Sequence, residues 1–309
     1  MDVQNDLNGF EEIVKEKHLF PGLVRDSGHE WEFDIDNPGR TQEIVDSVIN
    51  NGIPAELIEG ETNGIDRGSV PEIKSLPLGY GSSSDSLAFK TLSSTVDEVY
   101  KGAREKNLEI KLHPYNKKTG HTFGNHIHIG GNGLEDLMKV ANIMQAYEGI
   151  LIVIANPDNK DRVEAFGYKY GIAIAENANK KRKYKRSDIL IDWKNQRVEL
   201  RIIPMSEDLN TAFMVDQLVP RLISAAESNP EEMLRIQYLT NESPDGLSTY
   251  AEINRDRAIA GGSNAYLWDV EFEMADGSLK MTPYEGPIHD LINEYLDKVS
   301  DYSNFTSFN

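Results

Sequence analysis

The chain of 309 residues contains no cysteine. This absence excludes disulfide bonds, zinc sites built from thiolates and catalysis by a cysteine nucleophile. It agrees with a reducing compartment, and we expect a cytoplasmic protein. The N-terminus is acidic and polar where a basic and then apolar segment would be needed, so we predict no signal peptide.

Long hydrophobic runs and a positive net charge are also missing. The longest apolar run, residues 150–155, is far too short to cross a bilayer. The formal net charge of −19 argues against broad contact with nucleic acid or with an anionic membrane surface. Hydrophobic residues make up 39% of the chain and charged residues 27%, which is typical of a soluble globular protein.

The common nucleotide and metalloprotease signatures are absent too. There is no GxxxxGK[ST] motif and no HExxH motif, and the stretch GYGSSS lacks the third glycine of GxGxxG. If this protein uses a nucleotide, we therefore expect the nucleotide to be held by a metal site on a β-sheet.

Three short stretches carry the strongest pattern that the sequence does contain. In each, polar residues at positions i and i+2 surround a single apolar residue, so that a β-strand would point the polar pair to one face. Glycines bracket the second stretch, which suits a tight turn or a close approach to a ligand. The pairs are Glu30 and Glu32 in EWEFD, His126 and His128 in HIHIG, and Glu199 and Arg201 in VELRI.

Neighbouring carboxylates that face a cavity repel one another unless a cation lies between them. Carboxylate oxygens combined with an imidazole suit Mg²⁺ or Mn²⁺, and an adjacent arginine suits a phosphoryl group. Each strand alone is better explained by charges that face solvent, and it is the combination of three such strands that favours a site. A zinc hydrolase built on His126, His128 and an acid is a further alternative, but it gives no role to the Glu-x-Arg strand.

The remaining pattern predicts an α+β protein with a mainly antiparallel sheet. The basic run at residues 180–186 is either a solvated loop or a cradle for polyphosphate. We predict strands at 29–35, 86–94, 108–114 and 125–131, hairpins at 189–204 and around Asp276-Gly277, a loop over 59–83, and helices at 41–52, 95–106, 133–154, 207–238 (kinked at Pro220) and 286–300.

The order of these motifs resembles the glutamine synthetase-type carboxylate-amine ligases, and most closely the amidoligase group of bacteriophage and bacterial genomes. That superfamily carries Glu-x-Glu, then His-x-His or His-x-Asn, then Glu-x-Arg, which stand here as EWEF, HIHIG and VELR. The stretch RVEAFGYKYG, residues 162–171, also resembles the amidoligase pattern ahead of Glu-x-Arg. The resemblance covers roughly residues 28–206.

The resemblance implies a curved, mainly antiparallel sheet whose convex side carries helices and whose concave face holds ATP with Mg²⁺ or Mn²⁺. It implies a single domain over 1–309, with a core at 28–206 and a C-terminal helical and hairpin elaboration at 207–309. The implied reaction forms an amide or isopeptide bond through an acyl phosphate. The partners would be small-molecule or peptide carboxylates and amines in the cytoplasm (of the host, if the protein is phage-encoded), with no nucleic acid or membrane. An oligomer is left open.

Carried over position by position, the resemblance assigns roles to individual residues. Its implied metal ligands are Glu30, Glu32, His126 and Glu199. The implied phosphate-binding and catalytic residues are His128 and Arg201, and the implied nucleotide or substrate contacts are Arg162, Arg182 and Lys185.

One departure from the family concerns Lys90, which we place among the cofactor-binding residues. Between the first two motifs the family carries a further glutamate, and Lys90 stands where that acid is expected in SLAFKTLSS. Lys90 could replace one metal ion with a fixed positive charge, Asp85 could supply the carboxylate, or activity could be reduced. The alternative to a ligase is a non-catalytic protein, for example an assembly protein of a phage, that retains the ligase fold.

Overall fold

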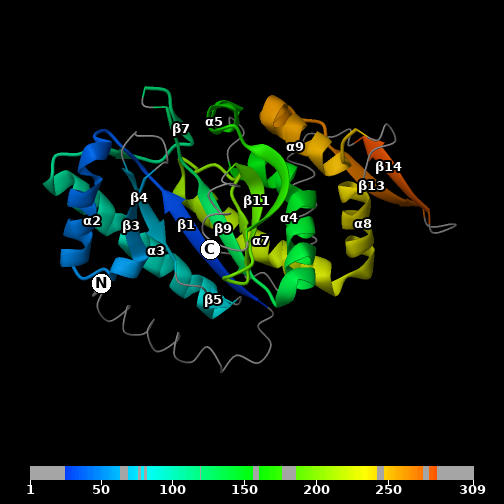
Figure 1. The fold of residues 1–309 in the computed structure, drawn as a ribbon, viewed down its shortest axis with the longest axis horizontal. Helices are drawn as coiled ribbons and strands as arrows, with labels where there is room; N and C mark the ends of the chain where they lie inside the picture. The colour runs from blue at the N-terminus through cyan, green and yellow to red at the C-terminus, as the bar shows by residue number, and fades with distance from the viewer. Residues whose placement is uncertain are drawn as a thin grey trace.

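The chain folds as a mixed α+β protein with a mostly antiparallel sheet, as the sequence predicts (Figure 1). The computed structural model describes residues 25–62, 69–75, 78–79, 82–118, 120–155, 160–175, 186–241, 247–273 and 278–283. The helices are α2 (Thr41–Asn50), α3 (Ser82–Glu105), α4 (Gly133–Ala155), α5 (Lys160–Phe166), α7 (Leu209–Ser228), α8 (Pro230–Thr240) and α9 (Tyr250–Gly261).

Eight strands form the main sheet, and the predicted motif strands lie side by side near its middle. The order is β10-β11-β12-β9-β1-β4-β3, with β5 paired to β1, and only β10 and β11 run parallel. The strands are β1 (Asp26–Glu32), β3 (Ile58–Thr62), β4 (Ser69–Lys74), β5 (Leu78–Gly79), β9 (Asn125–Gly130), β10 (Lys169–Ala175), β11 (Ser187–Asp192) and β12 (Arg197–Leu200). Shorter pairs and a late hairpin complete the fold: β2 (Asp34–Ile35) with β6 (Ile110–Lys111), β7 (Tyr115–Asn116) with β8 (His121–Thr122), and β13 (Trp268–Glu273) with β14 (Ser278–Pro283).

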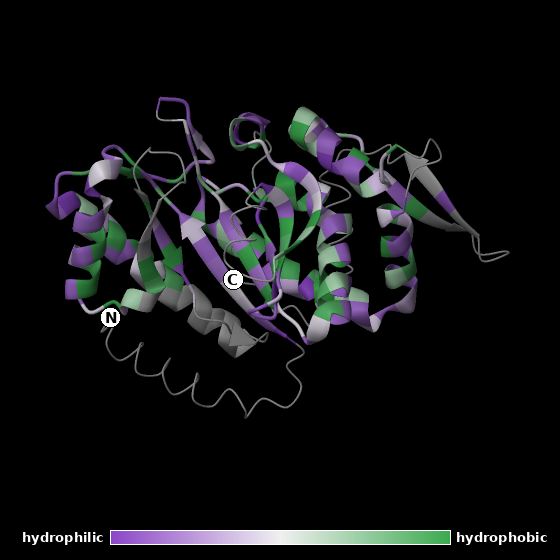
Figure 2. Cartoon of the chain, viewed as in Figure 1, coloured by the Kyte–Doolittle hydropathy of each residue, from purple (hydrophilic) through white to green (hydrophobic). Residues whose placement is uncertain are grey.

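Helices cover the apolar face of the sheet in two clusters (Figures 1 and 2). One cluster joins Ile127 and Ile129 of β9, and the apolar residues of β11 and β12, to α4, α7, α8 and α9. The other joins Trp31 of β1 and Ile73 of β4 to α2, α3 and the beginning of α7. Since alternate strand residues point to opposite faces, this packing leaves the polar pairs of β1, β9 and β12 on the other face.

Helix α4 is the one helix among the described residues that is long and apolar enough to cross a membrane. Of the relevant 18-residue window, 78% is buried within the protein, and many of the buried residues belong to the first cluster. The helix is therefore explained as the central core helix, which agrees with the predicted helix at 133–154.

The prediction was wrong between residues 59 and 94. The predicted loop over 59–83 contains strands β3, β4 and β5, and β4 pairs with β1. The predicted strand at 86–94 lies inside α3, which begins at Ser82 instead of Thr95. Leu92, Val96 and Val99 recur at helical spacing and pack in the second cluster, so tertiary burial selected the helix here.

The later elements follow the prediction more closely. The hairpin of β11 and β12 and the late hairpin of β13 and β14 are present. Helix α7 continues past the buried Pro220, and α8 follows directly, whereas α9 was not predicted. The predicted helix at 286–300 lies outside the described residues.

A buried carboxylate on α7 fixes the two central strands from the helical side. Asp216 accepts hydrogen bonds from Nε1 of Trp31 at 2.8 Å and from Nδ2 of Asn125 at 2.7 Å. These two residues are register partners on β1 and β9. Because a buried hydrogen-bonded carboxylate is costly to disturb, Asp216 holds the strands in register directly behind their polar residues.

Candidate active site

The structure brings the three predicted motifs together on one face of the sheet. In the ladder between β1 and β9, Glu30 lies opposite His126, and in the ladder between β9 and β12, His128 lies opposite Glu199. The intervening isoleucines of β9 are completely buried on the helical side. The expected alternation of polar and apolar faces is therefore confirmed, while the chemical roles of these residues stay predictions.

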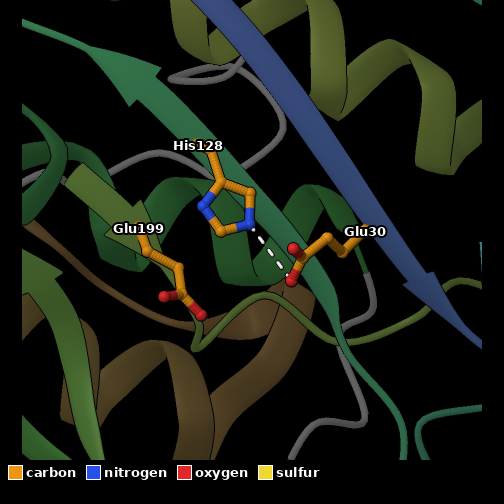
Figure 3. A group of neighbouring side chains, drawn as sticks. All are labelled: Glu30, His128 and Glu199. Atoms are coloured by element: carbon orange, nitrogen blue, oxygen red, sulfur yellow. Dashed lines mark ion pairs between the residues drawn. The ribbon is translucent and has the colours of Figure 1, made fainter. Parts of the chain in front are cut away.

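Three side chains form a candidate cation site at the centre of this face: Glu30, His128 and Glu199 (Figure 3). Each offers one ligand atom, and these atoms lie within 4.8 Å of one another. Nε2 of His128 lies 3.2 Å from Oε2 of Glu30. The three residues come from three adjacent strands, so the sheet itself fixes their spacing.

The state of His128 fits a role as cation ligand. The residue is 5% exposed, and neither ring nitrogen has a hydrogen-bond partner of good geometry, despite the short distance to Glu30. Burial lowers the pKa of His128, which favours the neutral imidazole that a metal requires. A buried imidazole without a partner, facing two carboxylates, is what a site for a divalent cation needs.

The two carboxylates are held in their ionised form. Burial opposes ionisation of Glu30, but attraction to His128 and His126 outweighs it and lowers the pKa of Glu30 well below its usual value. Burial likewise opposes ionisation of Glu199, but Arg201 overcomes it and lowers the pKa of Glu199 to about 2. Arg201 binds Glu199 with two hydrogen bonds, from Nε at 2.7 Å and from Nη2 at 2.9 Å.

His126 and Glu32 lie beside the candidate cation site, not within it. Nδ1 of His126 is 3.7 Å from Oε2 of Glu30 and 3.9 Å from Oε1 of Glu199. Burial lowers the pKa of His126, yet interaction with Glu30 and the other nearby acids raises it overall, which favours the charged form. The geometry thus favours His128 as the ligand, where the resemblance implies His126. Glu32 accepts a hydrogen bond from the backbone N–H of Gly124 at 2.5 Å.

Two residues of the polar face were missed by the sequence analysis: Glu72 and Lys74 on β4. Glu72 is the register partner of Glu32, and Lys74 is the register partner of Glu30. Nζ of Lys74 lies 3.2 Å from Oε1 of Glu72 and 3.9 Å from Oε1 of Glu30. The stretch EIK repeats the pattern of two charged residues around one apolar residue, and this pattern was the signal that could have identified them.

Arg162 has a different position from the one that the resemblance implies. Its side chain is 1% exposed and donates hydrogen bonds to the carbonyl oxygens of Phe123 and Ile202, both at 2.8 Å. It also donates to the carbonyl oxygen of Arg201 and to the hydroxyl of Tyr168. With its donors directed at these groups, Arg162 is a buried brace behind the site, and its contact with a nucleotide or substrate stays a prediction.

The other predicted basic residues lie on a helix or outside the described residues. Lys90 lies on α3, on the helical side of the sheet, because the stretch that was predicted as a strand is helical. Its predicted place on a strand lining the cavity is therefore wrong; Asp85, the alternative source of the carboxylate, lies on the same helix. Arg182 and Lys185 lie outside the described residues.

Comparison with known proteins gives distant structural similarity only. No family model matches the sequence, and no curated protein matches it. A crystal structure of the complex between prokaryotic ubiquitin-like protein Pup and its ligase PafA is similar to 90% of this chain, with 11% identity, a TM-score of 0.47 and 57% of that chain covered. A novel glutamine synthase homolog is similar to 90% of this chain, with 9% identity, a TM-score of 0.42 and 62% of that chain covered.

A third similar structure is the Plasmodium falciparum glutamine synthetase, with 12% identity, a TM-score of 0.46 and coverage of 65% of this chain and 51% of that one. The chain therefore spans between 51% and 62% of the length of these three proteins. Because all three TM-scores lie below 0.5, any functional argument has to rest on the residues of the candidate active site.

Proposed function

We propose that this protein is an ATP-dependent carboxylate-amine ligase that forms an amide or isopeptide bond through an acyl phosphate. One observation carries the proposal: two carboxylates and a buried imidazole form a candidate cation site beside the largely buried Arg201, on one face of a sheet. The order of the motifs along the chain, which resembles that of the glutamine synthetase-type ligases, supports the same reaction.

Each residue of the site has its own proposed role in binding the metal ion or the phosphate groups. Glu30, His128 and Glu199 would hold Mg²⁺ or Mn²⁺, which when bound would neutralise phosphate oxygens of ATP. Arg201 lies next to the ligand Glu199 and presents a planar set of donors that matches a phosphoryl group. His126, whose raised pKa favours the charged form, adds a positive group beside the same oxygens.

In the proposed reaction, a substrate carboxylate attacks the γ-phosphorus of ATP, and the bond to the β,γ-bridging oxygen breaks, which releases ADP. An amine then attacks the acyl carbon, phosphate leaves, and the amine loses a proton. The first step brings two negative groups together and the second releases a negatively charged phosphate, so a face with fixed cations and a divalent ion would stabilise both steps. We propose, as part of the same assignment, that residues 28–206 carry this site within a single domain.

Trapping of the acyl phosphate tests the reaction without knowledge of the natural amine. The protein is incubated with ATP, Mg²⁺, hydroxylamine and a panel of amino-acid and peptide carboxylates, and hydroxamate and ADP are measured. We expect both products with at least one carboxylate, and their loss in Glu199→Gln and Arg201→Met. Glu43→Gln is the matched control, because Glu43 is an exposed acid that pairs with Arg40 far from the site.

Calorimetric titration with ATP provides the decisive negative result. We expect binding that requires Mg²⁺ and that weakens at least tenfold in Glu199→Gln, a loss of about 1.4 kcal/mol. If the wild-type protein does not bind ATP at millimolar Mg²⁺, the ligase proposal is wrong, and a non-catalytic role becomes the better account.

A further inference from the structure

Lys74 occupies a central position on the polar face, although nothing in the resemblance assigns it a role. Strand β4 lies directly beside β1, and register pairs Lys74 with Glu30 and Glu72 with Glu32. The side chain of Lys74 is 26% exposed, so its ammonium group is largely withdrawn from water. An ammonium group placed among carboxylates interacts with them more strongly there than it would at an open surface.

The two oxygens of the Glu30 carboxylate face different groups. Oε1 of Glu30 lies 3.9 Å from Nζ of Lys74, whereas Oε2 of Glu30 lies 3.2 Å from Nε2 of His128. One oxygen therefore faces the lysine and the other faces the candidate cation site. Lys74 also lies 3.2 Å from Glu72, whose side chain is 2% exposed. The lysine thus neutralises the side of this face that the candidate cation site does not reach.

The charges of the polar face can be compared directly. Its acids on β1, β4 and β12 are Glu30, Glu32, Glu72 and Glu199, and its fixed cations on β4 and after β12 are Lys74 and Arg201. Arg197 at the beginning of β12 pairs with Asp192 at 3.6 Å and adds no net charge. Four carboxylates against two fixed cations leave a net charge of −2, and the charged form of His126, which its raised pKa favours, reduces this to −1, so one divalent cation suffices to neutralise this face.

We propose that Lys74 is a built-in counter-ion that takes the place of a second divalent cation, so that this site binds one metal ion. The ion would be held by Oε2 of Glu30, by His128 and by Glu199. The ring of His128 is buried, and neither of its nitrogens makes a hydrogen bond of good geometry, which is an independent sign that a ligand belongs at this place. The inference rests on the metal site of the proposed function, and it adds the number of ions and the residue that sets this number.

Counting bound Mn²⁺ tests the inference in the absence of nucleotide and of turnover. The metal-free full-length protein is titrated with Mn²⁺, and the free ion is measured by electron paramagnetic resonance. We expect one bound ion in the wild-type protein and two in Lys74→Met, where the ammonium group that faces Glu30 and Glu72 is removed. Lys74→Arg, which retains the charge, should again bind one ion.

The matched control is Lys111→Met. Lys111 is an exposed lysine that also pairs with a glutamate, Glu109, at 3.1 Å, so its removal changes the net charge of the protein equally. We expect Lys111→Met to bind one ion. A second ion in this control would mean that net charge, and not the position of Lys74, sets the number, and the inference would be overturned.

Two further results would overturn the inference: two ions, or none, in the wild-type protein, or a single ion in folded Lys74→Met. If Lys74→Met does not fold, the number of Mn²⁺ ions bound by the wild-type protein still tests the inference. A lysine that takes the place of one ion leaves room for only one bound Mn²⁺. The test is separate from the ligase proposal. One Mn²⁺ without ATP binding would refute the ligase alone, whereas hydroxamate formation with two ions would refute the role of Lys74 alone.

Discussion

Replacement of Arg162 by methionine distinguishes a structural brace from a nucleotide contact. The guanidinium group donates four hydrogen bonds: to the carbonyl oxygens of Phe123, Ile202 and Arg201, at distances between 2.8 and 3.1 Å, and to the hydroxyl of Tyr168 at 2.9 Å. Arg162 is 1% exposed, so water does not replace these donors freely. Methionine preserves most of the apolar stem but removes the donor of all four hydrogen bonds, although the carbonyl oxygen of Phe123 still accepts from the N–H of Met205 at 3.1 Å.

The size of the effect follows from these contacts. A buried polar group that loses its partner costs about 1–3 kcal/mol, and such losses add incompletely when the groups share one donor. We therefore expect Arg162→Met to lower the free energy of unfolding by about 3–5 kcal/mol, in the range of a severely destabilising core substitution. Because two of the acceptors belong to Arg201 and to the segment just before Gly124, the candidate active site should loosen as well.

Equilibrium unfolding in urea, followed by tryptophan fluorescence, measures this change. Lys160→Met is the matched control, because Lys160 lies on the same helix α5 but its side chain is 60% exposed and its ion pair with Glu164 is on the surface. We expect the control to change the free energy of unfolding by less than about 0.5 kcal/mol. The reasoning is refuted if Arg162→Met is as stable as the control and loses only ATP affinity, which is the behaviour of a nucleotide contact.

Two further substitutions test local features of the site and its support. Gly124→Ala should destabilise the protein and disturb the site, because an added Cβ would lie 2.6 Å from Nη2 of Arg162 and 2.7 Å from Nε2 of His126; a melting temperature equal to that of the wild type would contradict this. Asp208→Ala should cost about 1 kcal/mol at neutral pH, because Asp208 caps helix α7 by accepting from the N–H of Thr211 at 3.0 Å. The hydrogen bond from the Thr211 hydroxyl lowers the pKa of Asp208, so this stabilisation is present above the unfolded pKa of about 3.9 and is lost as the pH falls through the folded value. The difference between Asp208→Ala and wild type should therefore shrink in acid, and a constant difference down to pH 2 in urea titrations would argue against the cap.

The motif strands could be predicted because their local pattern and their burial agree. In EWEFD and HIHIG the apolar residues between the polar pairs are strong core residues, and Trp31 and Ile127 are indeed buried. Strict alternation with large apolar residues on one face identifies both the strand and its orientation. The convergence of these strands was predictable only because three separate pairs required one common face.

The strand β4 could not be predicted by the same reasoning. It contains Pro71 and lies in a stretch rich in glycine, serine and proline, and proline within a run argues against a strand. The sheet accommodates Pro71 at its pairing with Gly60, and the carbonyl oxygen of Pro71 accepts from the N–H of Phe33. The stretch at 86–94, whose sequence resembles a strand, was then predicted to be the strand between the first two motifs, and β4 is the strand that occupies this place in the sheet. As a result, Lys90 received a role for which Lys74 is the better placed residue.

The two apolar clusters meet beneath the candidate active site. Strand β1 belongs to the cluster around α2 and α3, whereas β9 and β12 belong to the cluster around α4. Glu30 is thus attached to one half of the protein, and His128 and Glu199 to the other. A cation bound by these three residues would connect the two clusters on the polar face of the sheet. On the opposite face, Asp216 of α7 already connects β1 and β9 through its hydrogen bonds to Trp31 and Asn125. A small rotation of one cluster relative to the other would change the distance between Glu30 and Glu199. Binding of the cation would therefore restrict this rotation, and its release would permit it.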